Sequence, residues 1–191
     1  RLMIRIGILG DIGSGKSYVA KKFGYPVFNA DQEVAKLYKK EKKVFLKLKR
    51  ILPKYIFSFP INKEEISKAI LANEKNLKKI VKIVHNEIRK KMSLFLRRNR
   101  SKKLVILDIP LLLENKLNGQ KDIIIFVKSK KSQINKRLKK RKNFNQKIFN
   151  KFKKLQLPLD YKSRKSNFTI KNDFTSKSVK KDIKAILKKI L

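Results

Sequence analysis

A glycine-rich segment near the start of the chain carries the most specific chemistry in the sequence. The residues GDIGSGKS, from Gly10 to Ser17, match the pattern G-x-x-x-x-G-K-[ST]. Glycines allow backbone conformations in which several N–H groups converge on one point, and such a nest binds phosphate oxygens. Lys16 can then reach the β- and γ-phosphates of a nucleotide, and the Ser17 hydroxyl can bind Mg²⁺. We therefore predict ATP and Mg²⁺ as cofactors, with ATP bound by Gly10, Asp11, Ile12, Gly13, Ser14, Gly15, Lys16, Ser17 and Tyr18.

The segments on either side of this loop provide the context that such a motif requires. The run over residues 3–9 is apolar and β-branched, which is typical of a buried parallel strand. After Ser17 the pattern becomes helical, with Val19, Ala20 and Phe23 on one face. Gly24 then ends the helix. A strand before the loop and a helix after it are what a phosphate-binding loop needs.

Two carboxylates come at the ends of later predicted strands. Asp108 ends a strand predicted over residues 104–109, and Asp31 follows a short strand that begins at Val27. Because ligands bind at the carboxyl ends of strands in open α/β sheets, we expect Asp108 to share a Mg²⁺ ion with Ser17. For Asp31 two interpretations stay open. It either accepts a proton from an attacking hydroxyl or serves as the N-cap of a helix over residues 32–38.

The rest of the chain alternates between strands and helices. Further strands are predicted over residues 122–127 and 167–170, and helices over 132–141, 145–155 and 176–190. From Leu77 to Phe95 apolar residues recur at helical spacing. This order predicts right-handed βαβ units and an α/β fold, in which helices cover a parallel sheet.

Charge is the unusual feature of the composition. Lys and Arg number 53 against 14 Asp and Glu, for a net charge of +39, which favours polyanions. The basic residues are spread along the whole chain, and Lys, Asn, Ile and Phe, the residues of A/T-rich codons, are all abundant. We therefore expect weak, salt-sensitive affinity for nucleic acid and no specific nucleic-acid partner.

Cysteine content and hydropathy exclude several kinds of site and a membrane-spanning segment. The sequence has no cysteine, which excludes disulfides, thiolate metal sites and a cysteine nucleophile. No apolar run approaches the ~18 residues of a membrane span. We expect a cytoplasmic protein with a small-molecule substrate and no membrane partner, as a monomer or a weak homo-oligomer.

Several segments, in order, resemble those of one enzyme family. IGILGDIGSGKS resembles IGLTGGIGSGKS, the opening of dephospho-CoA kinases, and NADQEVAKLY resembles their DADxxAxxLY. LDIPLLLE resembles D-[IV]-P-L-L-F-E, and QINKRLKKR resembles the lid motif Q-x-x-R-L-x-x-R with one extra residue. QLPLDYK and NFTIKN resemble the closing Q-x-P…K…AD-x-x-I-x-N, and IVHNEI lies where the family has an HP dipeptide. The chain is identified by this resemblance as a dephospho-CoA kinase.

The resemblance implies a reaction and a set of roles. ATP would phosphorylate the ribose 3′-hydroxyl of dephospho-CoA, giving CoA and ADP. Asp31 would be the general base, Lys16 would stabilise charge on the transferring phosphate, and two lid arginines would clamp ATP. The implied catalytic residues are Asp31, Lys16, Arg137 and Arg141. The implied substrate-binding residues are Asp31, His85, Pro110, Leu111, Leu112 and Glu114.

The family also implies a three-layer α/β/α P-loop NTPase fold with a five-stranded parallel sheet. Its core would comprise about residues 1–31, 101–131 and 165–191, with a helical acceptor-binding insert over about 32–100 and a helical lid over about 132–164. Asn29, Asp11 and Asn86 depart from the family's residues. The alternatives are another P-loop nucleoside or nucleotide kinase, or an ATP-switched nucleic-acid-binding protein.

Overall fold

The computed structural model describes residues 2–191, which form two compact units. The first, called the sheet unit below, contains the residues up to Asn29 together with Phe95–Phe144 and Gln156–Leu191. The second, called the helical unit, contains Ala30–Leu94 and Asn145–Leu155.

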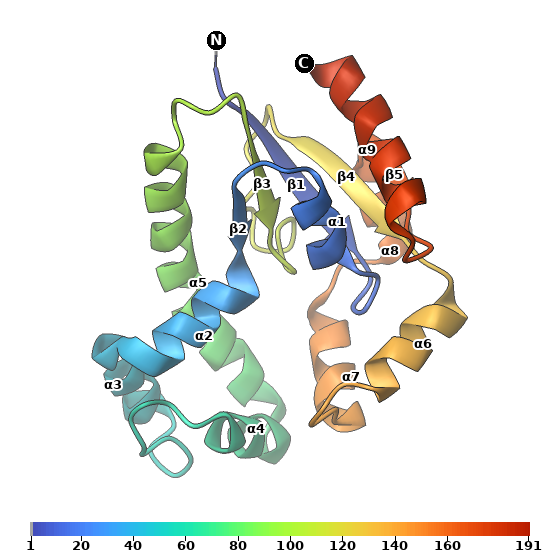
Figure 1. Cartoon of the computed structure of the whole chain (residues 1–191). Coiled ribbons are helices and arrows are strands. Elements are labelled where there is room, and N and C mark those ends of the chain that lie inside the picture. Colours follow the sequence, from blue (N-terminus) through green and yellow to red (C-terminus); the bar gives the residue numbers. More distant parts are fainter. Residues whose placement is uncertain (1) are drawn as a thin grey trace. The chain divides into compact units, whose positions relative to one another are not determined.

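The sheet unit is built on a parallel sheet with the strand order β2-β3-β1-β4-β5 (Figure 1). Every pairing in the sheet is parallel, which confirms the predicted α/β fold with five parallel strands. Three strands lie one residue further along the chain than predicted, and β3 ends one residue earlier. The strands are β1 (Ile4–Gly10), β2 (Val27–Asn29), β3 (Leu104–Asp108), β4 (Ile123–Lys128) and β5 (Phe168–Lys171).

The strand order places a ligand-binding position beside β1. This strand lies between β3 and β4, so the order of the strands along the sheet reverses next to it. In open α/β sheets the crevice at the carboxyl ends of the strands at such a reversal is where ligands bind. The loop over residues 10–17 follows β1, while Asn29 and Asp108 end β2 and β3 as partners in register.

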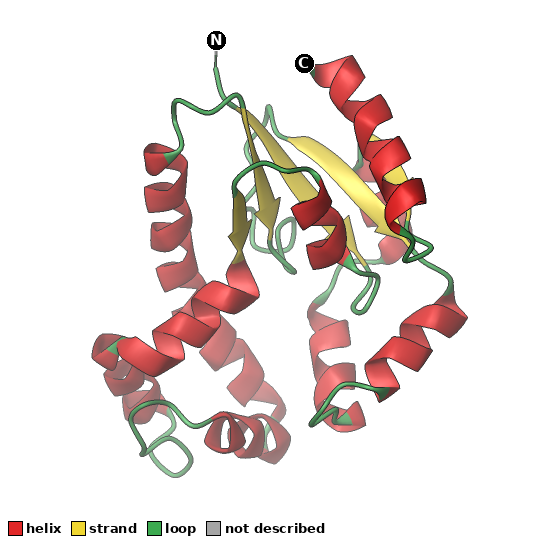
Figure 2. Cartoon of the chain, in the orientation of Figure 1, coloured by secondary structure: helices red, strands yellow, loops and turns green. Residues whose placement is uncertain are grey.

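Helices cover both faces of this sheet (Figure 2). On one face α1 (Lys16–Lys22) and α9 (Ser176–Ile190) bury Val19, Ala20, Val179 and Ile183 against Ile6 and Ile8 of β1, among others. Because side chains alternate across a strand, Gly7 faces the other way, where Leu112 packs against it. On that second face α8 (Leu159–Lys165) contacts β1 and β4. The predicted three layers are therefore present.

One more helix of the sheet unit packs on the glycine-rich loop. In α6 (Lys131–Lys139), Ile134 and Leu138 are buried and lie so close to Gly13 that a β-carbon there would be 3.1 Å from Leu138. The helix was predicted to continue to Arg141. It ends at Lys139, so Arg137 lies within the helix and Arg141 two residues beyond it.

The helical unit is held together by the apolar faces of its helices. It contains α2 (Ala30–Lys40), α3 (Lys42–Ile51), α4 (Lys63–Ala72), most of α5 (Glu74–Arg98) and α7 (Gln146–Leu155). In α5 the buried residues Leu77, Ile80, Val84, Ile88 and Met92 recur at three- and four-residue intervals, so they form one stripe of the helix.

A buried carboxylate in α4 binds the backbone of the loop that precedes this helix. Glu65 is 6% exposed, and its Oε1 accepts hydrogen bonds from the N–H groups of Phe57, at 2.8 Å, and Ser58, at 3.0 Å. Burial acts to raise the pKa of Glu65, but these N–H donors outweigh it and hold the pKa below its ordinary value. The ionised carboxylate therefore fixes the backbone of the loop.

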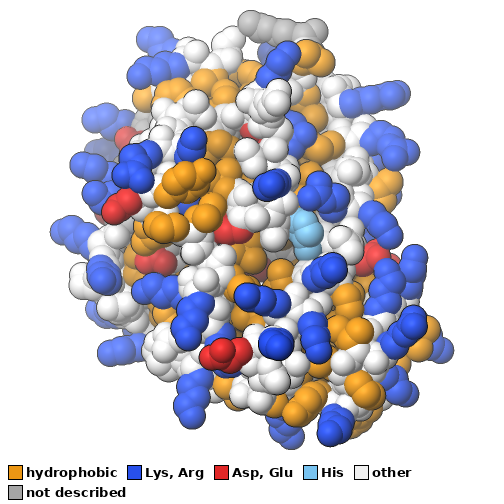
Figure 3. All heavy atoms as spheres, turned by 180° about the vertical axis from the view of Figure 1, so that it is seen from behind, with side chains coloured by type: hydrophobic (Ala, Val, Ile, Leu, Met, Phe, Trp, Pro, Cys, Tyr) orange, Lys and Arg blue, Asp and Glu red, His pale blue; other side chains and the backbone are white. Residues whose placement is uncertain are grey.

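The surface carries the charge that the composition requires. Lys and Arg side chains are spread over the face displayed in Figure 3, with few Asp or Glu among them. Among residues 2–191 the structure contains no helix with the length and apolar character needed to span a membrane.

Candidate active site

The glycine-rich loop has a backbone that only glycine can adopt easily at its turning point. Gly15, the N-cap of α1, has φ +86°, in the left-handed region. A β-carbon on Gly15 would also collide with Nδ2 of Asn172 and would lie 2.8 Å from Cε1 of Phe174. No side chain caps the start of α1, and its first turn contains no acidic residue. The positive end of the helix dipole at the start of α1 therefore has no side-chain cap and no acidic residue in its own first turn, and such a helix start favours an anion.

Two side chains from neighbouring strands hold the loop in this conformation. The carbonyl oxygen of Ser14 accepts hydrogen bonds from Ser129 Oγ, at 2.7 Å, and from Asn172 Nδ2, at 2.9 Å. Ser129 follows β4 and Asn172 follows β5. Because the C=O and N–H of a trans peptide point in opposite directions, the N–H of Gly15 faces away from both partners. The ends of β4 and β5 therefore set the orientation of this peptide.

Lys16 and Asp11 both lie close to the backbone of the loop. Lys16 Nζ donates to the carbonyl oxygens of Asp11, at 2.9 Å, and Gly10, at 3.3 Å. Asp11 Oδ1 accepts a hydrogen bond from the N–H of Ile12 at 2.8 Å. The carboxylate that departs from the family pattern is therefore engaged by the next peptide of its own loop.

The two predicted metal ligands meet across the sheet. Ser17 Oγ donates to Asp108 Oδ2 at 2.6 Å, although the residues are 91 positions apart. Asn29 Nδ2 donates to the same carboxylate oxygen at 3.1 Å and lies 3.4 Å from Ser17 Oγ. Asp108 is 4% exposed. Asn29, where the family resemblance has Asp, thus supplies an amide N–H to the buried carboxylate.

This pair fits Mg²⁺. A hydroxyl and a carboxylate are hard oxygen donors, which Mg²⁺ prefers. The described residues contain no cluster of three or more His, Cys, Asp or Glu that could enclose an ion. Proteins usually hold Mg²⁺ by one or two protein oxygens together with water and substrate phosphates.

Asp31 lies inside a helix rather than at its cap. Helix α2 begins at Ala30, so Asp31 is its second residue, and the N-cap interpretation is wrong in that respect. The side chain is exposed in the first turn, which it shares with Glu33, and a carboxylate there is favoured by the helix dipole. Asn29, which donates to Asp108, precedes Asp31 by two residues.

The segment PLLLE forms a coil of turns on the second face of the sheet. Leu112 N donates to Ile109 O and Leu117 N to Leu112 O, at 3.2 and 2.9 Å. Leu112 is fully buried against Gly7, so the structure gives this predicted acceptor residue a packing role. Pro110 and Leu111 are half-buried.

Glu114 anchors the same segment to a distant part of the chain. Its Oε2 is 2.5 Å from Nζ of Lys162 and accepts the N–H of Leu157 at 2.9 Å. The side chains of Glu114 and Lys162 are 8% and 0% exposed. We call Glu114, Leu157 and Lys162 the Glu114 junction. A buried ion pair with a further N–H donor fixes the segment much more firmly than a solvated charge would.

The residues that follow PLLLE contact Arg5 of β1, directly or through Asp122. Arg5 Nε lies 3.0 Å from Asp122 Oδ1, and Arg5 also donates to Leu117 O at 3.4 Å. The N–H of Gly119 donates to Asp122 Oδ2 at 2.7 Å. Burial raises the pKa of Asp122 in spite of both partners. These contacts hold the residues that follow PLLLE, and the Glu114 junction holds the last residue of PLLLE itself.

The remaining predicted residues lie in three places. His85 is half-buried in α5 of the helical unit, and its pKa is lowered by burial and then by the charge of Arg89. Arg137 in α6 lies over the ring of Phe174, with its guanidinium carbon 4.1 Å from the ring centroid. Arg141 is exposed beyond the end of α6.

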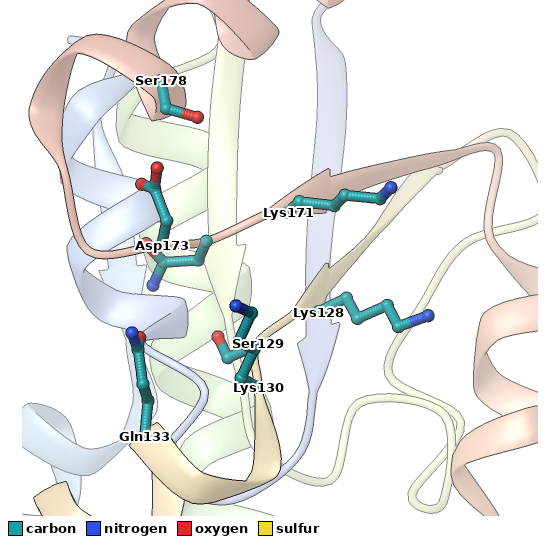
Figure 4. Close-up of a pocket in the computed structure, with 8 residues that line it drawn as sticks. Lys128, Ser129, Lys130, Gln133, Lys171, Asp173 and Ser178 are labelled. Carbon is teal, nitrogen blue, oxygen red and sulfur yellow. The ribbon is translucent and has the colours of Figure 1, made fainter.

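A pocket opens at the ends of β4 and β5. It has a volume of about 490 Å³, and its lining includes Ser129 and Asn172, the two residues that hold the glycine-rich loop. In Figure 4, Gln133, Asp173 and Ser178 lie on one side, while Lys128 and Lys171 extend together toward the other. The lysines of its wall favour an anionic ligand.

The fold and this site define a phosphotransferase of the P-loop class: a parallel α/β sheet, a phosphate-binding loop after β1 and a carboxylate at the end of β3. Residues 4–178 match the family model for dephospho-CoA kinase. The chain therefore belongs to the dephospho-CoA kinase family, whose members transfer phosphate to an alcohol group.

Individual relatives agree with this assignment. A dephospho-CoA kinase from Wolbachia sp. subsp. Brugia malayi (strain TRS) is 32% identical over 187 residues, which is 95% of each chain. The crystal structure of TT1252 from Thermus thermophilus has a TM-score of 0.80 and 26% identity over 100% of both chains. A dephospho-CoA kinase from Campylobacter jejuni, at 18% identity over 97% of this chain and 96% of its own, shares the fold with a TM-score of 0.62.

Sequence reasoning missed several residues of the site. Ser129, Asn172 and Phe174 lie against the phosphate loop, and Lys162 pairs with Glu114. Asn172 and Lys162 do fall in the two closing segments that resemble the family, so the resemblance marked them without giving them a role. Ser129 and Phe174 carried no signal that could be recognised in the sequence.

Proposed function

We propose that the chain phosphorylates the ribose 3′-hydroxyl of dephospho-CoA with ATP, with Mg²⁺ as cofactor. The observation that carries the proposal is the hydrogen bond between Ser17 and Asp108, which joins the phosphate loop to the end of β3. Ser17 and Asp108 would hold Mg²⁺, directly or through water, and the ion would neutralise charge on the β- and γ-phosphates.

The residues of the chain would divide the reaction between them. The 3′-oxygen of the acceptor attacks the γ-phosphorus, and the bond from that phosphorus to the β–γ bridging oxygen breaks, which releases ADP. The hydroxyl proton passes to the carboxylate of Asp31. Lys16 leaves the loop carbonyls for the phosphate oxygens. Arg137 and Arg141 would clamp the ATP phosphates when the lid over about residues 132–164 closes, which excludes water.

The pocket at the ends of β4 and β5 would hold the part of ATP that extends beyond the phosphate loop. Its volume lies in the range of small-molecule sites, and it shares Ser129 and Asn172 with the support of that loop. The acceptor would bind to Asp31, His85, Pro110, Leu111, Leu112 and Glu114, as the resemblance implies. The insert over about residues 32–100 would supply much of that acceptor site.

The proposed substrates also suit a particular cellular location. A kinase that uses ATP and a CoA precursor would act in the cytoplasm, as a monomer or a weak homo-oligomer. Its basic surface would bind nucleic acid only weakly and without specificity.

A coupled ADP-release assay with a panel of acceptors tests the proposal. Purified protein receives ATP and Mg²⁺ with dephospho-CoA, adenosine or a pantetheine fragment, and the Lys16→Ala variant controls for contaminating kinases. We expect saturable turnover with dephospho-CoA alone. Turnover of adenosine without turnover of dephospho-CoA would show that the protein is another P-loop nucleoside kinase.

A further inference from the structure

Phe174 has a backbone conformation that a residue of its size rarely adopts. Its φ is +63°, in the left-handed region, where the β-carbon of any residue but glycine is crowded. It lies in the short loop between β5 and α9, where glycine would be unstrained. Because backbone strain of this kind is concentrated at functional sites, we expect the side chain of Phe174 to have a function beside the phosphate loop.

The strained residue is fixed by the same side chain that holds the phosphate loop. The N–H of Phe174 donates to Asn172 Oδ1 at 2.9 Å, and Nδ2 of the same amide donates to Ser14 O at 2.9 Å. Asn172 is 3% exposed, and its own N–H donates to Lys128 O at 2.8 Å. One buried amide therefore sets the positions of Phe174 and of the phosphate loop together.

The ring of Phe174 connects that loop to a lid arginine. Its Cε1 would be 2.8 Å from a β-carbon on Gly15, so the ring lies directly on the loop. The guanidinium carbon of Arg137 is 4.1 Å from the centroid of the same ring, within the range of a cation–π contact. Arg137 is otherwise an exposed side chain. Without the ring it would lose the aromatic contact that limits its conformations.

We propose that Phe174 is a positioning residue that holds Arg137 beside the phosphate loop. The inference rests on the proposed role of Arg137 as a clamp on the ATP phosphates. The ring orders the guanidinium before ATP binds, so less conformational entropy is lost when the arginine engages phosphate. Arginine suits this arrangement better than lysine because its planar guanidinium stacks on an aromatic face.

The test is a double-mutant cycle between Phe174 and Arg137, measured by steady-state kinetics with ATP as the varied substrate. Phe174→Gly relieves the backbone strain, so its thermal stability should equal or exceed that of the unchanged protein. Its kcat/KM for ATP should nevertheless fall by about 2–5-fold, the effect of one exposed cation–π contact. Phe174→Leu should show a similar loss, and Phe174→Tyr, which keeps an aromatic face, should not.

The cycle separates the inference from the proposed function. The effect of Phe174→Gly should disappear in an Arg137→Ala background. Two results would show that the positioning role of Phe174 is wrong while the clamp role of Arg137 is retained. One is a loss of kcat/KM for ATP in Arg137→Ala without a loss in Phe174→Gly. The other is a loss in the double variant equal to the product of the two single losses. If Arg137→Ala has full activity toward dephospho-CoA, the clamp role is wrong and the inference falls with it. The side-chain Nε–Hε NMR resonance of Arg137 should also lose its ring-current shift in Phe174→Gly.

Discussion

The phosphate loop and the Glu114 junction show two ways in which a chain builds a functional region. The loop is a run of eight consecutive residues, from Gly10 to Ser17, whose glycines and hydroxyl suit one ligand class. The junction joins Glu114 to Leu157, 43 positions away, and to Lys162. Nothing near Glu114 in the sequence indicates a partner.

The difference lies in what sets the chemistry of each region. The donors of the loop are backbone N–H groups, whose direction depends on the φ and ψ angles of neighbouring residues. The strength of the junction depends on the exclusion of water from a carboxylate and an ammonium, and that requires the packed fold. A local motif can therefore identify the ligand, while the structure identifies what holds the acceptor segment in place.

The loop is tested most severely by Lys16→Ala. Removing the ammonium that stabilises charge on the transferred phosphate should lower turnover by about 1,000-fold. Lys21→Ala, which removes an exposed lysine from the same helix α1, is the matched control and should have nearly unchanged kinetics. ADP release measures both. If Lys16→Ala retained activity within tenfold of the unchanged protein, Lys16 would not be a catalytic residue.

The junction is tested by Lys162→Met. Removing the ammonium leaves the buried carboxylate of Glu114 without its ion-pair partner, which should destabilise the fold by about 3–5 kcal/mol. Urea unfolding followed by circular dichroism measures the change. The double variant Glu114→Gln, Lys162→Met should recover much of the loss because no buried charge remains. A loss below about 1 kcal/mol in Lys162→Met would show that the pair is not a firm anchor.

The proposed role of Asp31, unlike the structure of the loop and of the junction, comes from the family resemblance. Asp31→Asn should lower kcat by about 100-fold, since the amide cannot take the proton of the attacking hydroxyl. ATP binding, measured by calorimetry, should remain close to that of the unchanged protein. Glu33→Gln, in the same first turn of α2, is the control for helix stability. Unchanged turnover in Asp31→Asn would exclude Asp31 as the base.

Glu65 shows what a buried carboxylate does when its partners are N–H groups instead of an ammonium. Glu65→Gln keeps an acceptor for Phe57 and Ser58 but loses the charge, so we expect a loss of about 1 kcal/mol at neutral pH. Glu65→Ala should lose more because both N–H groups would have no acceptor.

The pH dependence of this effect has a definite sign. The pKa of Glu65 is lower in the folded protein than its ordinary value of 4.5, so its contribution is complete above 4.5 and is lost as pH falls through the folded value. The difference in unfolding free energy between the unchanged protein and Glu65→Gln should therefore shrink below about pH 4.5. A difference that stays constant from pH 7 to pH 3 would contradict the assigned charge state.

The sequence predicted the sheet well because each strand is a short apolar run with a clear boundary. The observed β1 begins and ends only one residue later than predicted, and Asp108 was correctly placed at the end of β3. The start of α2 was less accurate, because Ala30 continues directly from β2 and Asp31 looks like a cap. The packing of Leu112 on Gly7 and of Phe174 on Gly15 could not be predicted, because each depends on elements brought together only by folding.

Identification of the reaction product tests the proposed activity most directly. Purified protein is incubated with ATP, Mg²⁺ and dephospho-CoA, and the nucleotide product is examined by phosphorus and proton NMR. We expect one new phosphomonoester on the ribose 3′-oxygen for each ADP formed, and none with Lys16→Ala. ADP release without that phosphomonoester, or a phosphate on a different hydroxyl, would contradict the proposed activity.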